Sequence, residues 1–289
     1  MIRYDVDPAD LIARIQKMKP KWIGNAEKRK EEYKKAGKYT GGTEFWAQVK
    51  DVYISLQHEK CAYCEMKLAG RRYGSKLHEV EHFRPKSRVR TWPGTIKRLS
   101  KYSPPCPTGA ASTTGYYLLA YNPFNYAIAC TRCNSSLKSD YFPVKGKRML
   151  MEEDAGKFAA EQALLIYPVS NIDTQPEALI GFVGVTAVPL HSAGHEYERA
   201  RVTIDFFDLN HEDLTTRRAE VVGTLYLALK ARGMAKRPHD IHEFDDHIAS
   251  MISEQSAFSS CARAYLALYR NDPASAVKIG KAAAQMRPR

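Results

Sequence analysis

The chain has 289 residues, of which 44% are hydrophobic and 26% are charged, as is ordinary for a soluble globular protein. No apolar run approaches the roughly 18–20 residues that span a bilayer, and the start of the chain lacks the apolar core of a signal peptide. We therefore expect a cytoplasmic protein with no membrane segment.

The formal net charge of +12 is unevenly distributed along the chain. Residues 1–150 hold 29 Lys and Arg against 13 Asp and Glu, whereas residues 151–289 hold 15 against 19. The first half is therefore a candidate surface for a polyanion such as nucleic acid. A lysine-rich surface that only keeps the protein soluble is the other interpretation, and charge alone does not decide between them.

Two helices are expected before the first cysteine. Apolar residues between positions 11 and 18 share one helical face, which predicts a helix over residues 8–37. A Gly-Gly pair follows, and the pattern then predicts a second helix over residues 43–58 with Thr43 as its N-cap.

The middle of the chain mixes short strands with a long irregular stretch. Residues 76–84 resemble a strand, and an aromatic and apolar run at 116–129 leads to a helix expected after Asn134. Residues 88–114 are rich in proline, Ser and Thr, which indicates a long insertion that could be mobile.

The last third is expected to be mostly helical. Two apolar runs within residues 163–190 flank a turn-like segment and predict a hairpin or small sheet. From residue 195 the pattern is helical, with breaks near Gly233–Pro238 and Asn271–Pro273.

Six cysteines occur, and four of them form two CxxC pairs, Cys61–Cys64 and Cys130–Cys133. Disulfides are disfavoured in a reducing cytosol, so paired CxxC motifs indicate a metal site. Four thiolates suit a structural zinc ion. The 65 residues between the pairs exceed the spacing found in a simple zinc ribbon, which implies that a further structural unit lies between them.

Between and beside the pairs lie Glu81-His82 with Pro85 shortly after, then Asn125 five residues before Cys130, and Asn134 directly after Cys133. This order resembles the HNH (ββα-metal) nuclease family, in the variant whose fold is held by a four-cysteine zinc. In that family the first strand of a hairpin carries an acid and a histidine, the hairpin carries an asparagine, and the following helix carries the last ligand.

The resemblance implies a role for each of these residues. Glu81 and Asn134 would bind a catalytic Mg²⁺ or Mn²⁺, because carboxylate and amide oxygens are hard ligands. His82 would be the general base that takes a proton from the attacking water. Asn125 would hold the loop that carries the base.

Several charged residues surround this motif. Basic side chains near it are candidate phosphate contacts: Arg84, Lys86, Arg88, Arg90 and Lys138. Glu79 lies on the same strand face as Glu81 and is a candidate second acid, with His78 less certain. For Glu79 and His78 a solvated strand residue is the favoured interpretation.

Three longer blocks within residues 45–220 resemble the HNH nucleases of Septu-type anti-phage defence, including retron-associated ones, which are encoded with an ATPase partner. They are GYYLLAYNPFNYAIACTRCNSSLKSDYFPV, LLIYPVSNIDTQPEALIGFVG and RARVTIDFFDLNHEDLTTRR. The chain departs from the simplest pattern at three positions. The acid is Glu81 rather than Asp, Asn134 replaces a His, and Lys138 follows Asn134 by four residues rather than three.

The expected fold class is therefore α+β and mostly helical, with a ββα-metal core clamped by zinc. Residues 1–42 would form an N-terminal helical segment, residues 43–150 the nuclease domain with its insertion near 88–114, and residues 151–289 a hairpin and helical region for partner docking. The expected function is metal-dependent cleavage of DNA with an ATPase partner. The alternatives are a non-catalytic, zinc-stabilised nucleic-acid-binding module and an assembly subunit.

Overall fold

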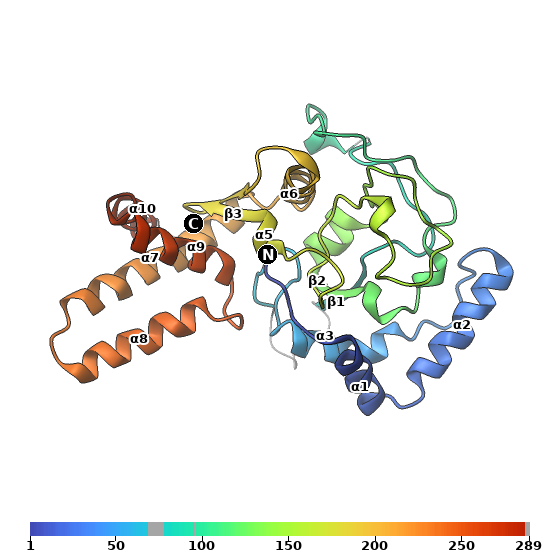
Figure 1. Ribbon diagram of the computed structural model, residues 1–289, viewed down its shortest axis with the longest axis horizontal. Helices are drawn as coiled ribbons and strands as arrows, with labels where there is room; N and C mark the ends of the chain where they lie inside the picture. Colours follow the sequence, from blue (N-terminus) through green and yellow to red (C-terminus); the bar gives the residue numbers. More distant parts are fainter. Residues whose placement is uncertain (69–77, 95, 287–289) are drawn as a thin grey trace.

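The computed structural model describes residues 1–68, 78–94 and 96–286. In the described residues, helices dominate and two two-stranded antiparallel sheets are present. The strand pair β1–β2 (His78–His82 and Tyr126–Cys130) and helices α1–α3 (within residues 8–56) lie at one end of the molecule, and helices α7–α10 (within residues 212–285) gather at the other (Figure 1). Of the helices described, none is both long and apolar enough to cross a membrane.

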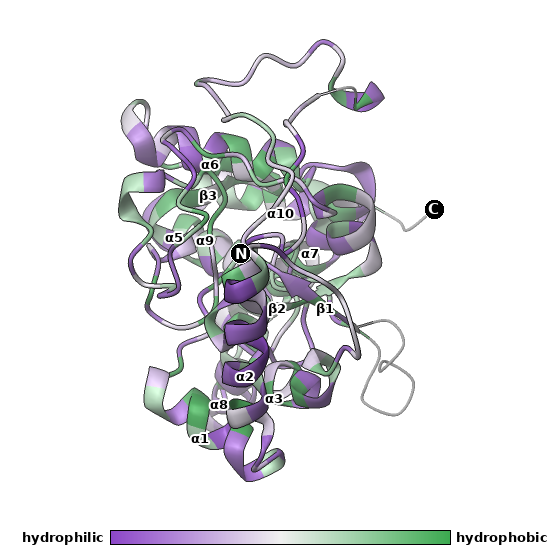
Figure 2. Cartoon of the chain, turned by 90° about the vertical axis from the view of Figure 1, so that its right-hand side faces the viewer, coloured by the Kyte–Doolittle hydropathy of each residue, from purple (hydrophilic) through white to green (hydrophobic). Residues whose placement is uncertain are grey.

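The N-terminal helical segment is two helices rather than the single one expected. Helix α1 spans Pro8–Met18 and α2 spans Trp22–Ala36. Pro20 lies in the break, where it lacks an N–H donor and disfavours helical geometry at the residue before it. Figure 2 colours α2 mainly purple, in keeping with its many charged residues.

The helix expected over residues 43–58 is shorter than predicted. A 3₁₀ turn at Trp46–Val49 leads into α3, which spans Lys50–Leu56. Thr43 is therefore not the N-cap, since the first helical turn begins three residues later. One side of α3 is buried, and its Tyr53 hydroxyl donates to the Pro123 carbonyl at 2.7 Å.

A strand pair followed by a helical turn forms the centre of the protein. Strand β1 (His78–His82) pairs antiparallel with β2 (Tyr126–Cys130), so that Glu81 lies opposite Ala127 and His82 opposite Tyr126. The helix expected after Asn134 begins two residues earlier, as η5 (Arg132–Lys138), and it is a π-helix. Its widened turn is closed by the Ser139 N–H, which donates to the Asn134 carbonyl at 2.6 Å.

The long stretch at 88–114 is irregular, as expected, but its described part is anchored to the rest of the chain. It holds a 3₁₀ turn at Lys97–Leu99 and a bridge between Val89 and Ser112. The Trp92 ring lies 5.3 Å from that of Phe206, and Arg98 donates to the Phe206 carbonyl at 2.7 Å. These contacts fasten the stretch to helix α6 (Gly194–Phe206; Figure 1), which argues against a freely mobile insertion.

The hairpin expected within 163–190 uses only the second apolar run. Strands β3 (Ile180–Val183) and β4 (Thr186–Pro189) pair after the short helix α5 (Pro176–Leu179). The first run is buried instead beside the central strands, where the Tyr167 hydroxyl donates to the Tyr126 carbonyl at 2.7 Å. These contacts cross the domain boundary expected at residue 150.

Five helices complete the chain: α6 Gly194–Phe206, α7 Glu212–Met234, α8 Pro238–Ile252, α9 Ser259–Asn271 and α10 Pro273–Gln285. The breaks predicted near 233–238 and 271–273 are confirmed, and two more occur at 207–211 and 253–258. Helices α7 and α10 approach closely at Gly223, where a Cβ atom would lie 2.8 Å from Ala284 Cα.

A buried charge cluster ties the first CxxC pair to helix α9. Glu65 is 1% exposed and accepts from the α-amino group of Met1 at 2.6 Å and from the Ser260 backbone N–H at 3.2 Å. The ammonium of Lys60 lies 3.8 Å from the same carboxylate. Burial alone would raise the pKa of Glu65, but the neighbouring cations of Met1 and Lys60 outweigh it and lower the pKa to about 2.

We expect Glu65→Gln to lower the free energy of unfolding by about 3 kcal/mol at pH 7, because it leaves buried cations without their carboxylate. The folded-state pKa lies below the unfolded value, so this stabilisation is complete above about pH 4.3 and is lost as the pH falls toward 2. Urea unfolding should show that the difference in unfolding free energy between the parent and Glu65→Gln is smaller at pH 3 than at pH 7. Exposed Glu31→Gln on α2 is the control, and a Glu65 variant as stable as the parent at pH 7 would contradict the analysis.

Candidate catalytic and metal sites

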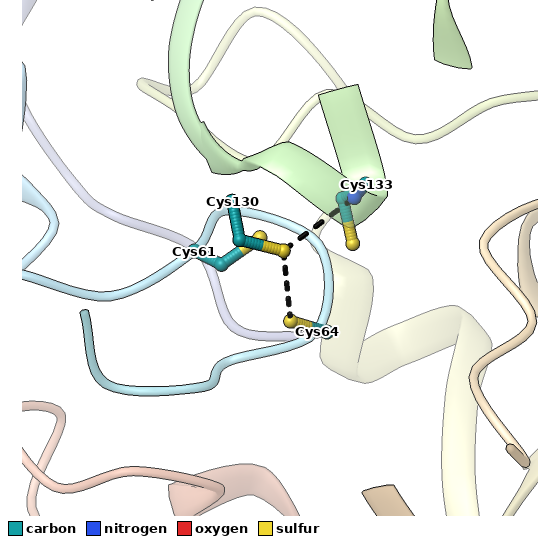
Figure 3. A group of neighbouring side chains, drawn as sticks. All are labelled: Cys61, Cys64, Cys130 and Cys133. Carbon is teal, nitrogen blue, oxygen red and sulfur yellow. Dashed lines mark hydrogen bonds between the residues drawn. The ribbon is translucent and has the colours of Figure 1, made fainter. Parts of the chain in front are cut away.

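The four paired cysteines meet in one buried cluster, as the sequence predicted. Their sulfur atoms all lie within 4.8 Å of one another, and Cys64 Sγ is 4.0 Å from Cys130 Sγ. Cys61 and Cys64 come from one loop, and Cys130 and Cys133 come from the end of β2 and the turn that follows (Figure 3). Tetrahedral zinc with bonds of 2.3 Å needs sulfur atoms about 3.8 Å apart, so the cluster fits that ion.

Backbone hydrogen bonds shape the turn that carries Cys61 and Cys64. The Cys61 N–H donates to the Met66 carbonyl at 3.0 Å, and the Glu65 N–H donates to the Cys61 carbonyl at 3.1 Å. The turn requires φ = 60° at Glu65, a conformation that costs energy outside glycine. The Ala62 N–H donates to the Ile128 carbonyl at 2.9 Å and so joins this turn to β2.

Hydrogen bonds within the cluster shift the pKa values of its thiols in opposite directions. Hydrogen bonds from Cys133, Cys61 and Cys64 lower the pKa of the Cys130 thiol. The same contacts raise the pKa of Cys64 and of Cys133. A divalent ion bound by the cluster would allow all four thiols to ionise.

His82 lies at the end of β1 in an aromatic enclosure. Its ring is flanked edge-to-face by Trp46 at 4.9 Å and Tyr126 at 5.1 Å, and its Nε2 lies 3.0 Å from the Ala120 carbonyl oxygen. Because a carbonyl only accepts hydrogen bonds, Nε2 carries the proton and Nδ1 is left with its lone pair. Burial, with help from the nearby Lys86 ammonium, holds the pKa of His82 well below its usual value.

Glu81 is buried beside a buried lysine. It is 3% exposed, and its Oε1 lies 3.1 Å from Lys138 Nζ, in an ion pair without hydrogen-bond geometry. Burial raises the pKa of Glu81 to about 7, although Lys138 opposes the shift. A buried carboxylate oxygen that accepts no hydrogen bond keeps lone pairs that can bind a hard cation.

Asn134 contacts Glu79 rather than Glu81 directly. Its Nδ2 donates to Glu79 Oε2 at 2.7 Å, and the Ser135 hydroxyl donates to the same oxygen at 2.6 Å. Glu79 is thus half-buried and hydrogen-bonded to η5 rather than fully solvated. The amide nitrogen of Asn134 is engaged by Glu79, which leaves its Oδ1 as the atom suited to a hard cation. The side chain of His78 lies outside the described residues.

Asn125 is a buried clamp on the loop that follows β1. Its Oδ1 accepts from the Arg84 N–H at 2.7 Å, and its Nδ2 donates to the carbonyls of Arg84 at 3.0 Å and Leu119 at 3.1 Å. The side chain is 1% exposed and uses both ends of its amide. This geometry suits the loop-holding role that the resemblance implies.

Two of the five basic residues expected at the surface are buried. Arg84 is 6% exposed, donates to Glu161 at 2.9 Å and stacks 3.9 Å from the Phe158 ring centroid. Lys138 is fully buried against Glu81. Neither is placed to contact a phosphate in this conformation, so that prediction is corrected for both.

The other three basic residues remain accessible. Arg88 and Arg90 both pair with Asp140 and are largely exposed. Lys86 is half-buried, with its ammonium 4.4 Å from the Trp46 ring centroid, and burial lowers its pKa. Lys86 therefore lies over the ring that covers His82.

The sequence did not single out the residues that enclose His82. Trp46 and Tyr126 flank its ring, and the Ala120 carbonyl accepts from both His82 and the Tyr126 hydroxyl, the latter at 2.6 Å. Glu161, which binds Arg84, was also missed. No spacing signal marks these residues, because each comes from a different segment.

We expect the purified chain to carry one equivalent of zinc, and Cys133→Ser to lose it. Loss of the ion should lower the free energy of unfolding by several kcal/mol, within the ~10 kcal/mol that structural zinc can supply. Elemental analysis and thermal unfolding measure both effects. The half-buried Cys106 lies outside the cluster, so Cys106→Ser is the control and should retain zinc; equal zinc content in both variants would contradict the assignment.

We expect the His82 imidazole to stay neutral and protonated at Nε2 at pH 6, whereas a free histidine is largely charged there. Because its folded-state pKa is lowered, the unfolded chain binds more protons below about pH 6.5, and this residue's share of stability falls as the pH drops. Nitrogen NMR of ¹⁵N-histidine-labelled protein reports the tautomer, with the exposed histidines as internal references. A doubly protonated His82 signal at pH 6 would refute this geometry.

Comparison with known proteins gives one distant relative. No protein-family model matches the chain, and no solved structure matches it. Among curated proteins it is similar to the Septu protein PtuB of Bacillus mycoides (strain KBAB4), with 27% identity over 179 residues. The aligned region covers 62% of this chain and 52% of that protein, so the chain spans about half the length of its relative. The chain is therefore a distant homologue of a Septu protein.

Proposed function

We propose that this chain is a metal-dependent HNH endonuclease that hydrolyses DNA phosphodiester bonds. The observation that carries the proposal is that β1 ends with a buried carboxylate, Glu81, followed directly by a buried neutral histidine, His82. His82 is oriented by the Ala120 carbonyl, and Glu81 Oε1 is buried without a hydrogen bond. A module that only binds nucleic acid has no need of this pair.

His82 would act as the general base. Its Nε2–H is committed to the Ala120 carbonyl at 3.0 Å, so Nδ1 is the atom that takes a proton from an attacking water. The low pKa of His82 keeps this lone pair available at neutral pH. Asn125 fixes the loop directly after the histidine, which keeps the ring in one orientation.

Glu81 and the Asn134 Oδ1 would hold the catalytic cation. The donor set is two hard oxygens with no thiolate or imidazole, which suits Mg²⁺ or Mn²⁺. A divalent ion there would neutralise the scissile phosphate and the leaving oxygen. Glu79 would orient the Asn134 amide through its bond to Nδ2 at 2.7 Å.

The basic first half of the chain supports DNA as the substrate. Arg88 and Arg90 lie a few residues beyond His82 and are largely exposed, where they can contact phosphates without reading sequence. Residues 151–289 carry more acidic than basic side chains, and we assign them to docking of a partner. The distant homology to a Septu protein agrees with the resemblance to Septu-type nucleases, and we therefore assign the chain an effector role in anti-phage defence with an ATPase partner.

A non-catalytic, zinc-stabilised module or assembly subunit is the competing function. The observation that favours it is the ion pair between Lys138 and Glu81, which engages the candidate cation ligand. A purely structural carboxylate would be expected to have such a partner.

Plasmid cleavage by the zinc-loaded chain separates these functions. With Mg²⁺ or Mn²⁺, and with the proposed ATPase partner co-expressed, we expect nicking or linearisation that falls at least 100-fold in His82→Ala, because loss of a general base costs about 10²–10⁴-fold. His239→Ala on α8 is the control, since that side chain is 88% exposed and contacts no part of the site. DNA retention without cleavage under either metal, with the partner present, would support the binding module instead.

A further inference from the structure

Lys138, at the candidate cation site, is unusual because a lysine is rarely fully buried. Lys138 and Lys60 are the fully buried lysines among the described residues. The Lys138 ammonium lies 3.1 Å from Glu81 Oε1 and donates to the His82 carbonyl at 3.4 Å. A buried ammonium is costly unless a carboxylate balances it, and Glu81 is the carboxylate that does so here.

A divalent ion and this ammonium would compete for the same oxygen. Mg²⁺ binds carboxylate oxygens at about 2.0–2.1 Å and tolerates little distortion of its octahedral shell. An ion bound to Glu81 Oε1 would therefore lie within a few ångströms of Lys138 Nζ, at a point with almost no water to screen the repulsion. The two cations therefore repel each other, and each weakens the binding of the other to this carboxylate.

We propose that Lys138 is a built-in competitor for the catalytic cation: its ammonium holds Glu81, and a divalent ion loads only by displacing it. The inference rests on the proposed nuclease function, in which Glu81 is a metal ligand. It makes loading of the ion weak until a phosphodiester arrives, because the phosphate supplies negative charge for both cations. The nuclease is thereby kept inactive when no substrate is present.

The turn that carries Lys138 supports the same inference independently. Asn134 and Lys138 are four residues apart on η5 and reach two acids on one face of β1, Glu79 and Glu81. The widened turn ends at Ser139, whose φ of 41° is strained for a residue other than glycine. A single turn thus presents one candidate metal ligand and the cation that opposes the metal, so displacement of Lys138 is coupled to the position of Asn134.

Binding of Mn²⁺ to the full-length, zinc-loaded chain tests the proposal without any cleavage assay. In electron paramagnetic resonance or calorimetric titrations without DNA, we expect Lys138→Met to bind Mn²⁺ at least tenfold more tightly than the parent. The double variant with Glu81→Gln should lose that gain. Lys60→Met is the matched control, because it removes the other fully buried lysine, at Glu65, and should leave Mn²⁺ affinity unchanged.

A second variant, Lys138→Gln, keeps a polar group of similar length and should also tighten binding, so the test does not depend on one variant folding. Affinity that is unchanged or weaker in both Lys138 variants, yet lost in Glu81→Gln, would overturn the role of Lys138 and leave the nuclease site intact. If replacing Glu81 leaves the Mn²⁺ affinity unchanged in every variant, Glu81 is not a metal ligand. That result would contradict both the catalytic metal site and the proposed competition with Lys138.

Discussion

The candidate site depends on the four thiols that join two distant parts of the chain. Cys61 and Cys64 precede β1, whereas Cys130 and Cys133 end β2, and their sulfurs share a space that fits one zinc ion. Gln57 reinforces this junction, since its Nε2 donates to the carbonyls of Lys60 and Ile128 and its Oε1 accepts from the Ile128 N–H at 2.7 Å. The register of the strand pair, and hence the place of the acid and the histidine, follows from this anchoring.

Around this junction the protein buries several pairs of opposite charges among its apolar side chains. Glu81 meets Lys138, Arg84 meets Glu161, and Glu65 meets Lys60. Such pairs add little net stability, because removing charges from water costs about as much as the pairing returns. Their value lies in orientation: Arg84 also belongs to the loop that Asn125 clamps, so its position and that of His82 are set together.

Local patterns predicted the parts of the site that are encoded by short spacings. The CxxC pairs, Glu81-His82 and Asn125 are all recognisable within a few residues, and the helix breaks at Gly and Pro were visible for the same reason. The partners of these residues were not predictable, because each contact spans a long stretch of chain. Glu161 is 77 residues from Arg84, and nothing near Lys138 shows that it will be buried against Glu81 rather than solvated. The first apolar run of residues 163–190 does not join the hairpin, because its backbone pairs with distant segments instead, in bridges of Ala163 with Val144 and of Val169 with Tyr4.

The arrangement around His82 implies that substrate entry and chemistry are coupled. The ring is 9% exposed, and neither the pocket of about 520 Å³ beside the cysteines nor that of about 330 Å³ beside Arg199 is lined by His82 or Glu81. Trp46 packs edge-to-face against the ring, and the Lys86 ammonium lies over Trp46. A phosphate that reaches His82 can pair with this ammonium, which no neutral ligand can do. Under the proposed function, an anionic substrate therefore gains a cationic contact beside His82 and also supplies negative charge between Lys138 and the divalent ion at Glu81.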